Sequence, residues 1–264
     1  MSDMLRDLLS ALGIYRIYQK WLRHQIKNGK KPEHIGIILD GNRRWARSSY
    51  ETLSGTGHPE GAKKVEEFLK WCLDLDIKTV TLYAFSTENF QRPQEEVEEI
   101  MKLAEEYLQR IMKDETIHKY RVRIKALGRL NMLPESLQQM IKSVEEQTKD
   151  YDRFYVNIAI AYGGRAEIID ATKKIVEEVR KGETRLEDID ETLFEKHLYT
   201  SHLPQQDPDL IIRTSGESRL SGFLLWQSAY SELFFMDVYW PDFREIDLER
   251  AIRAFGKRER RFGT

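Results

Sequence analysis

A dense group of polar residues follows the short apolar run Ile35 to Leu39. In order, the group consists of Asp40, Gly41, Asn42, Arg43, Arg44 and Trp45. A carboxylate can hold magnesium, a glycine lets the backbone turn and expose its amides to an anion, and arginines fork onto phosphate oxygens. An ordinary Asp-Gly turn with solvated arginines is the alternative. The density of these groups favours an anion-binding turn over this alternative.

A second polar segment follows the apolar run Lys78 to Phe85. It consists of Ser86, Thr87, Glu88, Asn89 and Phe90, with Arg92 and Pro93 after them. Ser or Thr followed by Glu or Asn is also typical of a helix cap, and capping is a strong explanation for this segment by itself. Capping does not explain Arg92, which fits a third guanidinium facing phosphate. Both interpretations stay open for this segment.

A third segment, from Arg213 to Ser221, reads RTSGESRLS. Arg213 and Arg219 flank a glycine turn with hydroxyl groups, and Leu220 precedes the final serine. The composition suits a second anion pocket, with a polar surface turn as the rival on local evidence. Two arginine-rich pockets would suit an enzyme that handles two phosphorylated substrates.

Two further ionisable residues stand near these segments. Glu232 lies in the run AYSELFF, where a buried carboxylate would need a metal or an arginine as its partner. His58 comes shortly after the first polar loop; a structural role is the more common fate of such a histidine, and its position alone makes it a candidate. The chain contains neither a GxxxxGKS or GxxxxGKT loop nor a GxGxxG motif, which argues against a nucleotide enzyme.

Short apolar runs alternate with helix-like segments along most of the chain. The apolar runs are 35–39, 78–85, 122–127, 154–161, 210–213, 223–226 and 233–238, and helices are expected at 61–73, 93–112, 134–148, 164–180 and 247–260. This alternation predicts one α/β domain with a largely parallel sheet covered on both faces. Ligands bind such sheets outside the carboxyl ends of the strands. The residues after Leu39, Phe85 and Ile212 are therefore the expected places for a site.

The first 31 residues differ from the rest in charge and pattern. An apolar stripe with helical spacing runs from Leu5 to Leu22, and Gly29 and Pro32 end the helix. Seven Lys and Arg stand in this segment against two acidic residues. We predict an N-terminal basic amphipathic helix at 1–31 and a catalytic domain at 32–264. A helix of this kind either lies on a membrane surface or packs on its own domain, and the sequence supports both.

The composition excludes several classes of protein. The 264 residues carry a formal net charge of −2, which gives no indication of nucleic acid as a partner. A single cysteine, Cys72, excludes an internal disulfide or a cysteine metal cluster. No apolar run approaches the roughly 20 residues of a spanning helix, and no signal peptide is visible. We therefore expect a cytoplasmic protein, with peripheral membrane contact left open for the N-terminal helix.

Six segments resemble, in order, the signature segments of the cis-prenyltransferases, the undecaprenyl diphosphate synthase family. They are HIGIILDGNRRWA, TLYAFSTENFQRP, NIAIAYGGRAEI, LIIRTSGESRLSGFLLWQSAYSELFF, VYWPDF and RERRFG. The resemblance runs from about His34 to Gly263. It implies a single α/β domain with a central, mostly parallel six-stranded sheet flanked by helices. The chain also lacks the DDxxD cluster by which trans-type prenyl synthases hold magnesium.

The resemblance also implies a reaction. In the family, an allylic diphosphate loses its diphosphate with the help of Mg2+, isopentenyl diphosphate attacks the allylic centre, and loss of a proton leaves a cis double bond. The starter would be geranylgeranyl or farnesyl diphosphate. The product would be a long-chain polyprenyl diphosphate for a glycosyl carrier lipid. The family also implies a homodimer.

The resemblance assigns a role to each candidate residue. Asp40 and Glu232 would hold Mg2+, with Asp40 catalytic beside the departing diphosphate. Gly41, Asn42, Arg43, Arg44, Trp45, His58 and Arg92 would surround the allylic diphosphate; Ser86, Thr87, Glu88 and Phe90 would line the substrate site; and Arg213, Arg219, Leu220 and Ser221 would hold isopentenyl diphosphate. Asn89 would accept the proton, although a neutral amide is a poor base, so the diphosphate or a water is an alternative acceptor.

Two departures from the bacterial members bear on the starter. Bacterial members carry an arginine in the loop before His58, where this chain has Ser54 in a loop that is one residue longer. They also often carry histidine where Ser218 stands. Both features resemble archaeal-type members, some of which start from geranylgeranyl diphosphate.

A non-catalytic partner subunit with the same fold is the alternative to an enzyme. Such subunits lack the acid and the arginines of the first loop. Asp40, Asn42, Arg44 and Glu232 are all present in this chain, which favours the enzyme.

Overall fold

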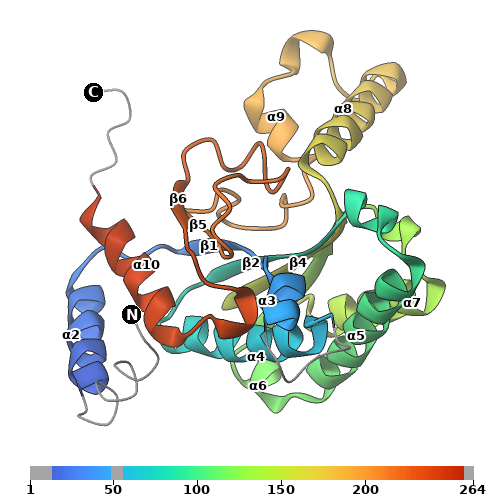
Figure 1. Ribbon diagram of the computed structural model, residues 1–264. Helices are drawn as coiled ribbons and strands as arrows, with labels where there is room; N and C mark the ends of the chain where they lie inside the picture. The colour runs from blue at the N-terminus through green and yellow to red at the C-terminus, as the bar shows by residue number, and fades with distance from the viewer. Residues whose placement is uncertain (1–13, 49–55, 259–264) are drawn as a thin grey trace.

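The structure is a computed structural model that describes residues 14–48 and 56–258. Within these residues, six strands form one sheet in the order β3-β4-β2-β1-β5-β6, and every pairing is parallel (Figure 1). The strands are β1 (His34–Ile38), β2 (Thr79–Ser86), β3 (Val122–Leu127), β4 (Phe154–Tyr162), β5 (Leu210–Arg213) and β6 (Glu232–Phe235). The predicted α/β domain with a mostly parallel six-stranded sheet is confirmed.

Helices cover both faces of this sheet, as Figure 1 shows. They are α2 (Ile14–Asn28), α3 (Asn42–Ser48), α4 (His58–Asp74), α5 (Gln94–Lys113), α6 (Glu115–Lys119), α7 (Glu135–Thr148), α8 (Gly164–Lys181), α9 (Glu191–Glu195) and α10 (Glu245–Lys257). Short 3-10 turns occupy Thr87–Gln91 (η1), Leu130–Met132 (η2), Leu186–Asp188 (η3) and Trp240–Asp242 (η4). The five helices expected after residue 60 are present, with ends shifted by a few residues.

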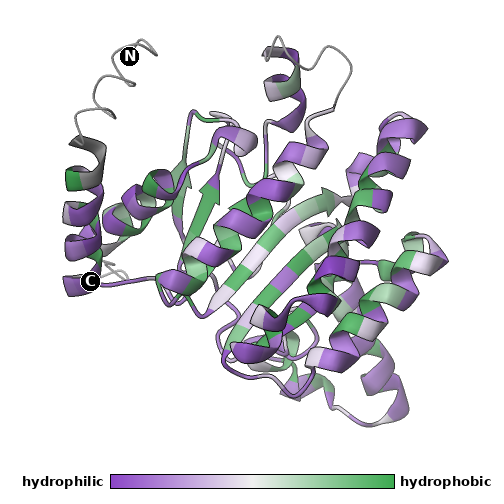
Figure 2. Ribbon diagram, turned by 90° about the horizontal axis from the view of Figure 1, so that it is seen from below, coloured by the Kyte–Doolittle hydropathy of each residue, from purple (hydrophilic) through white to green (hydrophobic). Residues whose placement is uncertain are grey.

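One face of the sheet packs against α10, α4, α5 and α7. In α4, Val65, Phe68, Leu69 and Cys72 recur at helical spacing, so one stripe of the helix faces strands β1 and β2. Figure 2 shows the same division by hydropathy, with hydrophobic strands beneath helices whose outer surfaces are hydrophilic. Full burial of a side chain as large as Phe68 contributes roughly 1.5–3 kcal/mol. These stripes fix where α4 and α5 lie over the sheet.

The opposite face is covered by α8 and by the segment that joins β5 to β6. Phe223 and Leu224 are fully buried here against Tyr83 and Tyr162. The expectation of a strand at 223–226 is wrong, because this run lies in turns. Ser221, Gly222 and Leu224 all have positive φ, which an extended strand cannot accommodate. An apolar run therefore signalled burial without strand pairing.

The strand order brings the three expected site positions together. β1 lies between β2 and β5, so the residues that follow these three strands leave the sheet at adjacent places on its carboxyl edge. Ile38 is level with Tyr83 of β2 and with Arg213 of β5. Parallel pairing thus collects chain segments that are more than a hundred residues apart.

The N-terminal helix is present, and α2 ends directly before Gly29 as predicted. Leu22 and Ile26 of α2 are buried, and Ile26 belongs to the same apolar core as Ile252 and Phe255 of α10. The stripe before residue 14 lies outside the described residues. The division into 1–31 and 32–264 stays a prediction. None of the described helices is long and apolar enough to span a membrane.

A chain of buried polar groups lies on the Tyr83 face of the sheet. The His34 imidazole Nε2 is 2.8 Å from Thr81 Oγ1, and Asn157 Nδ2 donates to the same oxygen at 3.0 Å. His202 Nε2 lies 2.9 Å from Asn157 Oδ1. Burial lowers the pKa of His34 and of His202 to about 4. Both rings are therefore neutral in the folded chain near neutral pH.

Lowering the pH below about 6.5 is expected to destabilise the fold through these two histidines. In the unfolded chain each imidazole takes up a proton near its ordinary pKa of 6.5, whereas in the folded chain it stays neutral down to about 4. The unfolded state binds more protons in this window, so the free energy of unfolding falls by up to about 1.4 kcal/mol per pH unit for each histidine. Denaturant titrations between about pH 7 and pH 5 measure this slope.

The His34→Gln variant isolates one of the two contributions. Glutamine can still hydrogen-bond to Thr81, but it does not titrate, so the slope should be smaller by one histidine's share. A slope equal to that of the unaltered chain would contradict the assignment.

Candidate active site

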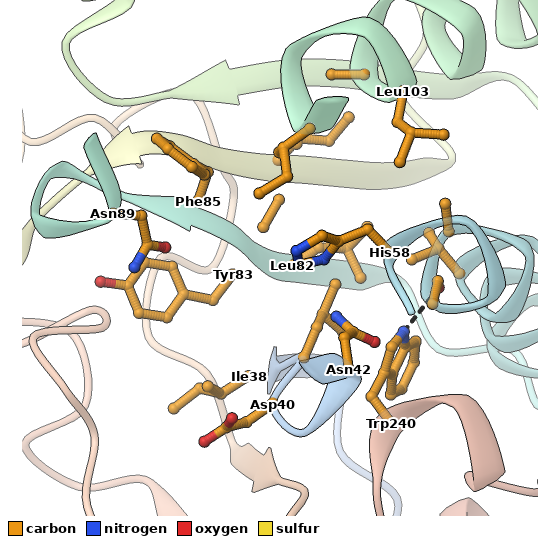
Figure 3. A pocket seen from close by; sticks show the side chains of 18 of the residues that line it. Ile38, Asp40, Asn42, His58, Leu82, Tyr83, Phe85, Asn89, Leu103 and Trp240 are labelled. Atoms are coloured by element: carbon orange, nitrogen blue, oxygen red, sulfur yellow. Dashed lines mark hydrogen bonds between the residues drawn. The ribbon is translucent and has the colours of Figure 1, made fainter. Parts of the chain in front are cut away.

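A cavity of about 590 Å3 lies at the carboxyl ends of the central strands. It extends between the sheet and helices α4 and α5 (Figure 3). Its polar mouth contains most of the predicted site residues: Asp40, Gly41, Asn42, Arg43, Arg44, His58, Ser86, Asn89, Arg92, Arg213 and Ser221. Its inner part is apolar and includes Leu82, Phe85, Leu103, Leu108 and Ile158. The polar mouth suits a charged head group, and the apolar inner part suits a hydrocarbon tail.

The loop after β1 places Asp40 at this mouth. Gly41 adopts φ +109°, and a Cβ there would lie 2.8 Å from the Tyr239 ring and 3.1 Å from Ser215 Cβ. Only glycine accommodates both the conformation and the close approach. Helix α3 then begins at Asn42, so its arginines project from the first turns beside the cavity. The predicted tight turn is thus a real feature of the site.

Asp40 is held between two arginines. Arg213 Nη2 donates to Asp40 Oδ2 at 2.7 Å, and Arg44 Nη2 donates to Oδ1 at 3.4 Å. Burial by itself would raise the pKa of the Asp40 carboxyl, but hydrogen bonds from Arg213 and Ser215 and the charges of Arg213 and Arg44 bring it below its ordinary value. Asp40 is therefore ionised at neutral pH and joins the first loop to the third.

The third segment folds back around Arg213. This guanidinium is almost fully buried; it donates to Ser221 Oγ at 2.8 Å and to the carbonyl oxygen of Arg219. Glu217 accepts from Arg219 at 2.5 Å and from Arg44 at 3.4 Å. The exposed Arg219 side chain fits the alternative of a polar surface turn. Arg213 does not fit it, because its guanidinium is buried and hydrogen-bonded inside the segment.

In the second segment, the structure contains the helix cap that the sequence allowed. The backbone amide of Ser86 donates to Asn89 Oδ1 at 3.0 Å, and the reciprocal bond to the Ser86 side chain completes a capping box for η1. A backbone amide must face an acceptor, which settles that the oxygen of Asn89 points to it. That oxygen therefore accepts one hydrogen bond that fixes the loop, and the role of Asn89 as proton acceptor stays a prediction.

Glu96, which the sequence did not single out, organises the other cations. Its carboxylate Oε1 lies 3.2 Å from His58 Nε2, 3.0 Å from Arg92 Nη1 and 3.9 Å from Arg43 Nε. Burial lowers the pKa of His58, although the Glu96 carboxylate opposes this effect. Glu96 stands in the first turn of α5 among other acids, and nothing in that pattern distinguishes it. Its position opposite α3 and α4 appears only in the fold.

Tyr83 was also missed, because it lies inside an apolar strand run. Its ring stacks on Phe223 with centroids 4.9 Å apart, and its hydroxyl donates to the carbonyl oxygen of Ser221 at 3.1 Å. Figure 3 shows Tyr83 between Asn89 and Ile38 at the cavity. Burial raises the pKa of Tyr83 to about 12, so its hydroxyl remains protonated and can serve as a donor.

Several predicted residues do not line the cavity; these are Trp45, Thr87, Glu88, Phe90, Arg219, Leu220 and Glu232. The Trp45 indole donates instead to Asp242 at 2.9 Å. Phe90 packs edge-on against Phe85 with centroids 4.9 Å apart, which supports the cavity wall from behind. These residues stay predictions as substrate contacts.

Within one chain, Glu232 lies apart from Asp40, and its role as the second magnesium ligand stays a prediction. Glu232 begins β6 and is level with Leu210, at the amino edge of the sheet, whereas Asp40 follows the carboxyl end of β1. Strand geometry separates the two backbones by about 15 Å along the strands and about 10 Å across them. Glu232 pairs with Arg258 instead. The described residues contain no group of three or more His, Cys, Asp or Glu able to hold a metal.

Comparisons with known proteins identify the family of this chain. A family model described as "Putative undecaprenyl diphosphate synthase" matches residues 38–263. A protein from Methanocaldococcus jannaschii is 56% identical over 97% of this chain and 91% of its own length. One from Methanopyrus kandleri is 52% identical over 97% of this chain and 93% of its own length. Both are named tritrans,polycis-undecaprenyl-diphosphate synthase (geranylgeranyl-diphosphate specific).

Solved structures show the same fold. Lavandulyl diphosphate synthase from Lavandula x intermedia, crystallised with dimethylallyl diphosphate, matches with a TM-score of 0.84 and 36% identity over 89% of this chain and 99% of that one. A protein described as a probable undecaprenyl diphosphate synthase from Campylobacter jejuni matches with a TM-score of 0.71 and 33% identity over 89% of this chain and 100% of that one. None of these names supports the partner-subunit alternative. The chain belongs to the undecaprenyl diphosphate synthase family, the cis-prenyltransferases, and is a prenyltransferase that elongates an allylic diphosphate.

Proposed function

We propose that this chain condenses isopentenyl diphosphate units, in the cis sense and with magnesium, onto geranylgeranyl diphosphate. The observation that carries the proposal is the position of Asp40. It stands where the arginines of the first loop meet Arg213 of the third, at the mouth of an apolar cavity. Two diphosphates could therefore lie side by side at one carboxylate, with one hydrocarbon tail in the cavity. The long-chain product would serve as a glycosyl carrier lipid.

The allylic diphosphate occupies the side of the mouth formed by α3, α4 and α5. Arg43, Arg92 and His58 converge there on Glu96, while Arg44 reaches from α3 to Asp40 and Ser215. Arginines present forked donors that match phosphate oxygens. Negative charge builds up on this diphosphate as it departs, so donors placed here stabilise the transition state more than the bound starter.

The cavity volume supports a starter of moderate length. An apolar cavity of about 150 Å3 accommodates a benzene molecule, so a cavity of about 590 Å3 has room for roughly 20 to 25 carbon atoms. That is sufficient for the twenty-carbon geranylgeranyl chain, and farnesyl diphosphate also fits. The names of the archaeal relatives support geranylgeranyl diphosphate as the starter.

Isopentenyl diphosphate occupies the opposite side of the mouth. Arg213 and Ser221 line the cavity there, and Arg219 stands at its rim beside Glu217. The Tyr83 hydroxyl holds the Ser221 carbonyl and so keeps this loop against β2. Binding both substrates across Asp40 orients the double bond of isopentenyl diphosphate towards the allylic carbon, which converts a bimolecular encounter into a positioned one.

One carboxylate at the mouth fits magnesium. This ion is commonly bound through one or two carboxylates together with substrate phosphates and water, so Asp40 and two diphosphates supply an adequate set of oxygens. Bound there, magnesium neutralises charge on the departing diphosphate. Arg213 and Arg44 now occupy the Asp40 oxygens, and both can turn to phosphate oxygens when substrates arrive.

The proton lost from isopentenyl diphosphate passes to a diphosphate oxygen in this proposal. Asn89 is a poor base, and its oxygen already accepts the Ser86 amide. Its contribution is to hold the loop between β2 and α5 in place beside the substrates.

The proposal includes a homodimer. β6 lies at the edge of the sheet, and no strand of the described residues pairs with its outer side. An open edge of this kind is a surface that proteins cover or pair.

Separate incubations with the two starters test the proposal. Purified protein is given labelled isopentenyl diphosphate, Mg2+ and either geranylgeranyl or farnesyl diphosphate, with a chelator as the metal control. We expect kcat/KM to be at least about tenfold higher with geranylgeranyl diphosphate, a difference worth about 1.4 kcal/mol in transition-state binding. Equal use of both starters would refute the starter assignment. Extension of neither, or full activity with the chelator, would refute the reaction proposed.

A further inference from the structure

The outward face of α2, together with the neighbouring part of α10, forms a surface of cations and apolar side chains. We call it the α2–α10 surface; it consists of Ile17, Lys20, Trp21, His24 and Lys27 of α2 with Arg250, Arg253 and Lys257 of α10. Ile17 is 69% exposed and Trp21 is 42% exposed. None of the residues of this surface is acidic. Large exposed apolar groups within a cationic surround call for an explanation.

The inner face of α2 packs against the rest of the domain, so only its outer face is accessible to a partner. Leu22 and Ile26 are buried towards the domain. Arg23 donates to Glu245 at 2.6 Å and to Glu249 at 2.7 Å, so these two acids of α10 pair with a cation of α2. Helix α2 therefore packs on its own domain, as one of the two alternatives predicted. This packing involves only one face of the helix.

Aromatic rings and guanidinium groups interleave on the α2–α10 surface. Tyr18 and Trp21 stack with centroids 5.6 Å apart. The guanidinium carbon of Arg253 lies 4.4 Å from the Trp21 centroid, and that of Arg250 lies 5.4 Å from the Tyr18 centroid. Aromatic side chains backed by Lys and Arg are typical of helices that lie in the headgroup region of a bilayer.

We propose that the α2–α10 surface docks the protein on an anionic lipid bilayer, with α2 lying in the plane of the headgroups. Lysine and arginine side chains would meet anionic headgroups, while Ile17 and Trp21 would enter the boundary between headgroups and acyl chains. Charge complementarity selects this partner, because a surface with these cations and no acid repels a second copy of itself. The proposal does not rest on the starter or the metal, since vesicle binding is measured without turnover.

Co-sedimentation with lipid vesicles tests the proposal. The full chain is mixed with phosphatidylcholine vesicles, either pure or containing a quarter of phosphatidylglycerol. Three variants are compared: Lys20→Glu/Lys27→Glu, Trp21→Ala, and the control Lys142→Glu/Lys149→Glu. Lys142 and Lys149 are exposed on and at the end of α7, on another side of the molecule, with the same spacing of seven residues.

The unaltered chain is expected to bind the anionic vesicles at least about tenfold more tightly than the neutral ones. Lys20→Glu/Lys27→Glu should lose about tenfold or more in binding to anionic vesicles, since each basic residue near such a surface contributes about fivefold. Trp21→Ala should weaken binding by a smaller factor, and the α7 control should bind like the unaltered chain. Elongation of a starter free in solution should be the same for all four proteins.

Three results would overturn the proposal. The first is equal binding of the unaltered chain to anionic and neutral vesicles. The second is a loss of binding in the α7 control equal to that in Lys20→Glu/Lys27→Glu. The third is a change of the solution mass in Lys20→Glu/Lys27→Glu with vesicle binding intact, which would assign the surface to contact between copies of the chain.

Discussion

Replacing Asp40 with asparagine is expected to lower kcat by about 10²- to 10³-fold, the range seen when one preorganised electrostatic group is removed from an active site. Asparagine keeps the size of the side chain but removes the charge that Arg213 and Arg44 contact at 2.7 and 3.4 Å. The variant would hold magnesium less well, so its residual activity should need a higher Mg2+ concentration. Steady-state kinetics over a range of Mg2+ measure both effects.

Asp188→Asn is the matched control for this variant. Asp188 pairs with Arg185 at 2.8 Å in η3, on the surface and apart from the cavity, so the same change there should leave kcat unaltered. Circular dichroism and thermal unfolding establish that Asp40→Asn is folded. If folded Asp40→Asn kept kcat within about threefold of the unaltered chain, Asp40 would have no part in departure of the diphosphate.

Replacing Glu96 with glutamine is expected to lower kcat/KM for the allylic diphosphate by about tenfold to 100-fold. Two effects oppose each other here. Removing the anion leaves the pocket more positive, which by itself would favour binding of the diphosphate. Losing the group that orients His58, Arg92 and Arg43 allows these side chains to shift, and a displacement of about 1 Å can cost 10²-fold in rate. Lost positioning therefore dominates.

The two substrates should respond differently to the Glu96 change. His58, Arg43 and Arg92 all lie on the allylic side, so KM for isopentenyl diphosphate should change by less than about twofold. Glu95→Gln is the control, because Glu95 is an exposed neighbour in the same turn of α5. Removal of the Glu96 charge should also lower the pKa of His58 further, since that carboxylate raises it. Equal loss for both substrates, or a phenotype equal to that of Glu95→Gln, would contradict this role.

The class of the fold could be predicted from the sequence, but the order of the strands in the sheet could not. Apolar runs alternating with helical stripes predict a parallel sheet, because parallel strands need long crossover connections, which are usually helices. Nothing local places β5 beside β1, since that pairing joins Ile35 to Leu210 across most of the chain. The run at 223–226 shows the limit of the apolar signal, because Phe223 is buried without belonging to a strand.

The sequence could predict those site residues that stand close together in the chain as clusters of charged and polar side chains. Asp40 and Arg44 follow β1 and Arg213 ends β5, and the structure joins the three residues through hydrogen bonds. Glu96 and Tyr83 could not be found this way, because one stands among many helix acids and the other within an apolar strand. Their roles come from contacts between elements distant in the chain.

Glu232 stays a prediction as a magnesium ligand. It belongs to the same continuous segment of sequence as Arg213, yet strand β6 begins at the amino edge of the sheet. The sequence could not predict this separation within the chain, because it follows from the direction in which β6 joins the sheet.

The geometry of the first new double bond tests the central claim most directly. Geranylgeranyl diphosphate, Mg2+ and isotopically labelled isopentenyl diphosphate are incubated with the enzyme, and the product is examined by nuclear magnetic resonance. The predicted result is that every labelled unit carries a cis double bond while the unlabelled units of the starter remain trans. Labelled units with trans double bonds, or a starter recovered without extension, would contradict the assignment of this chain as a cis-elongating prenyltransferase.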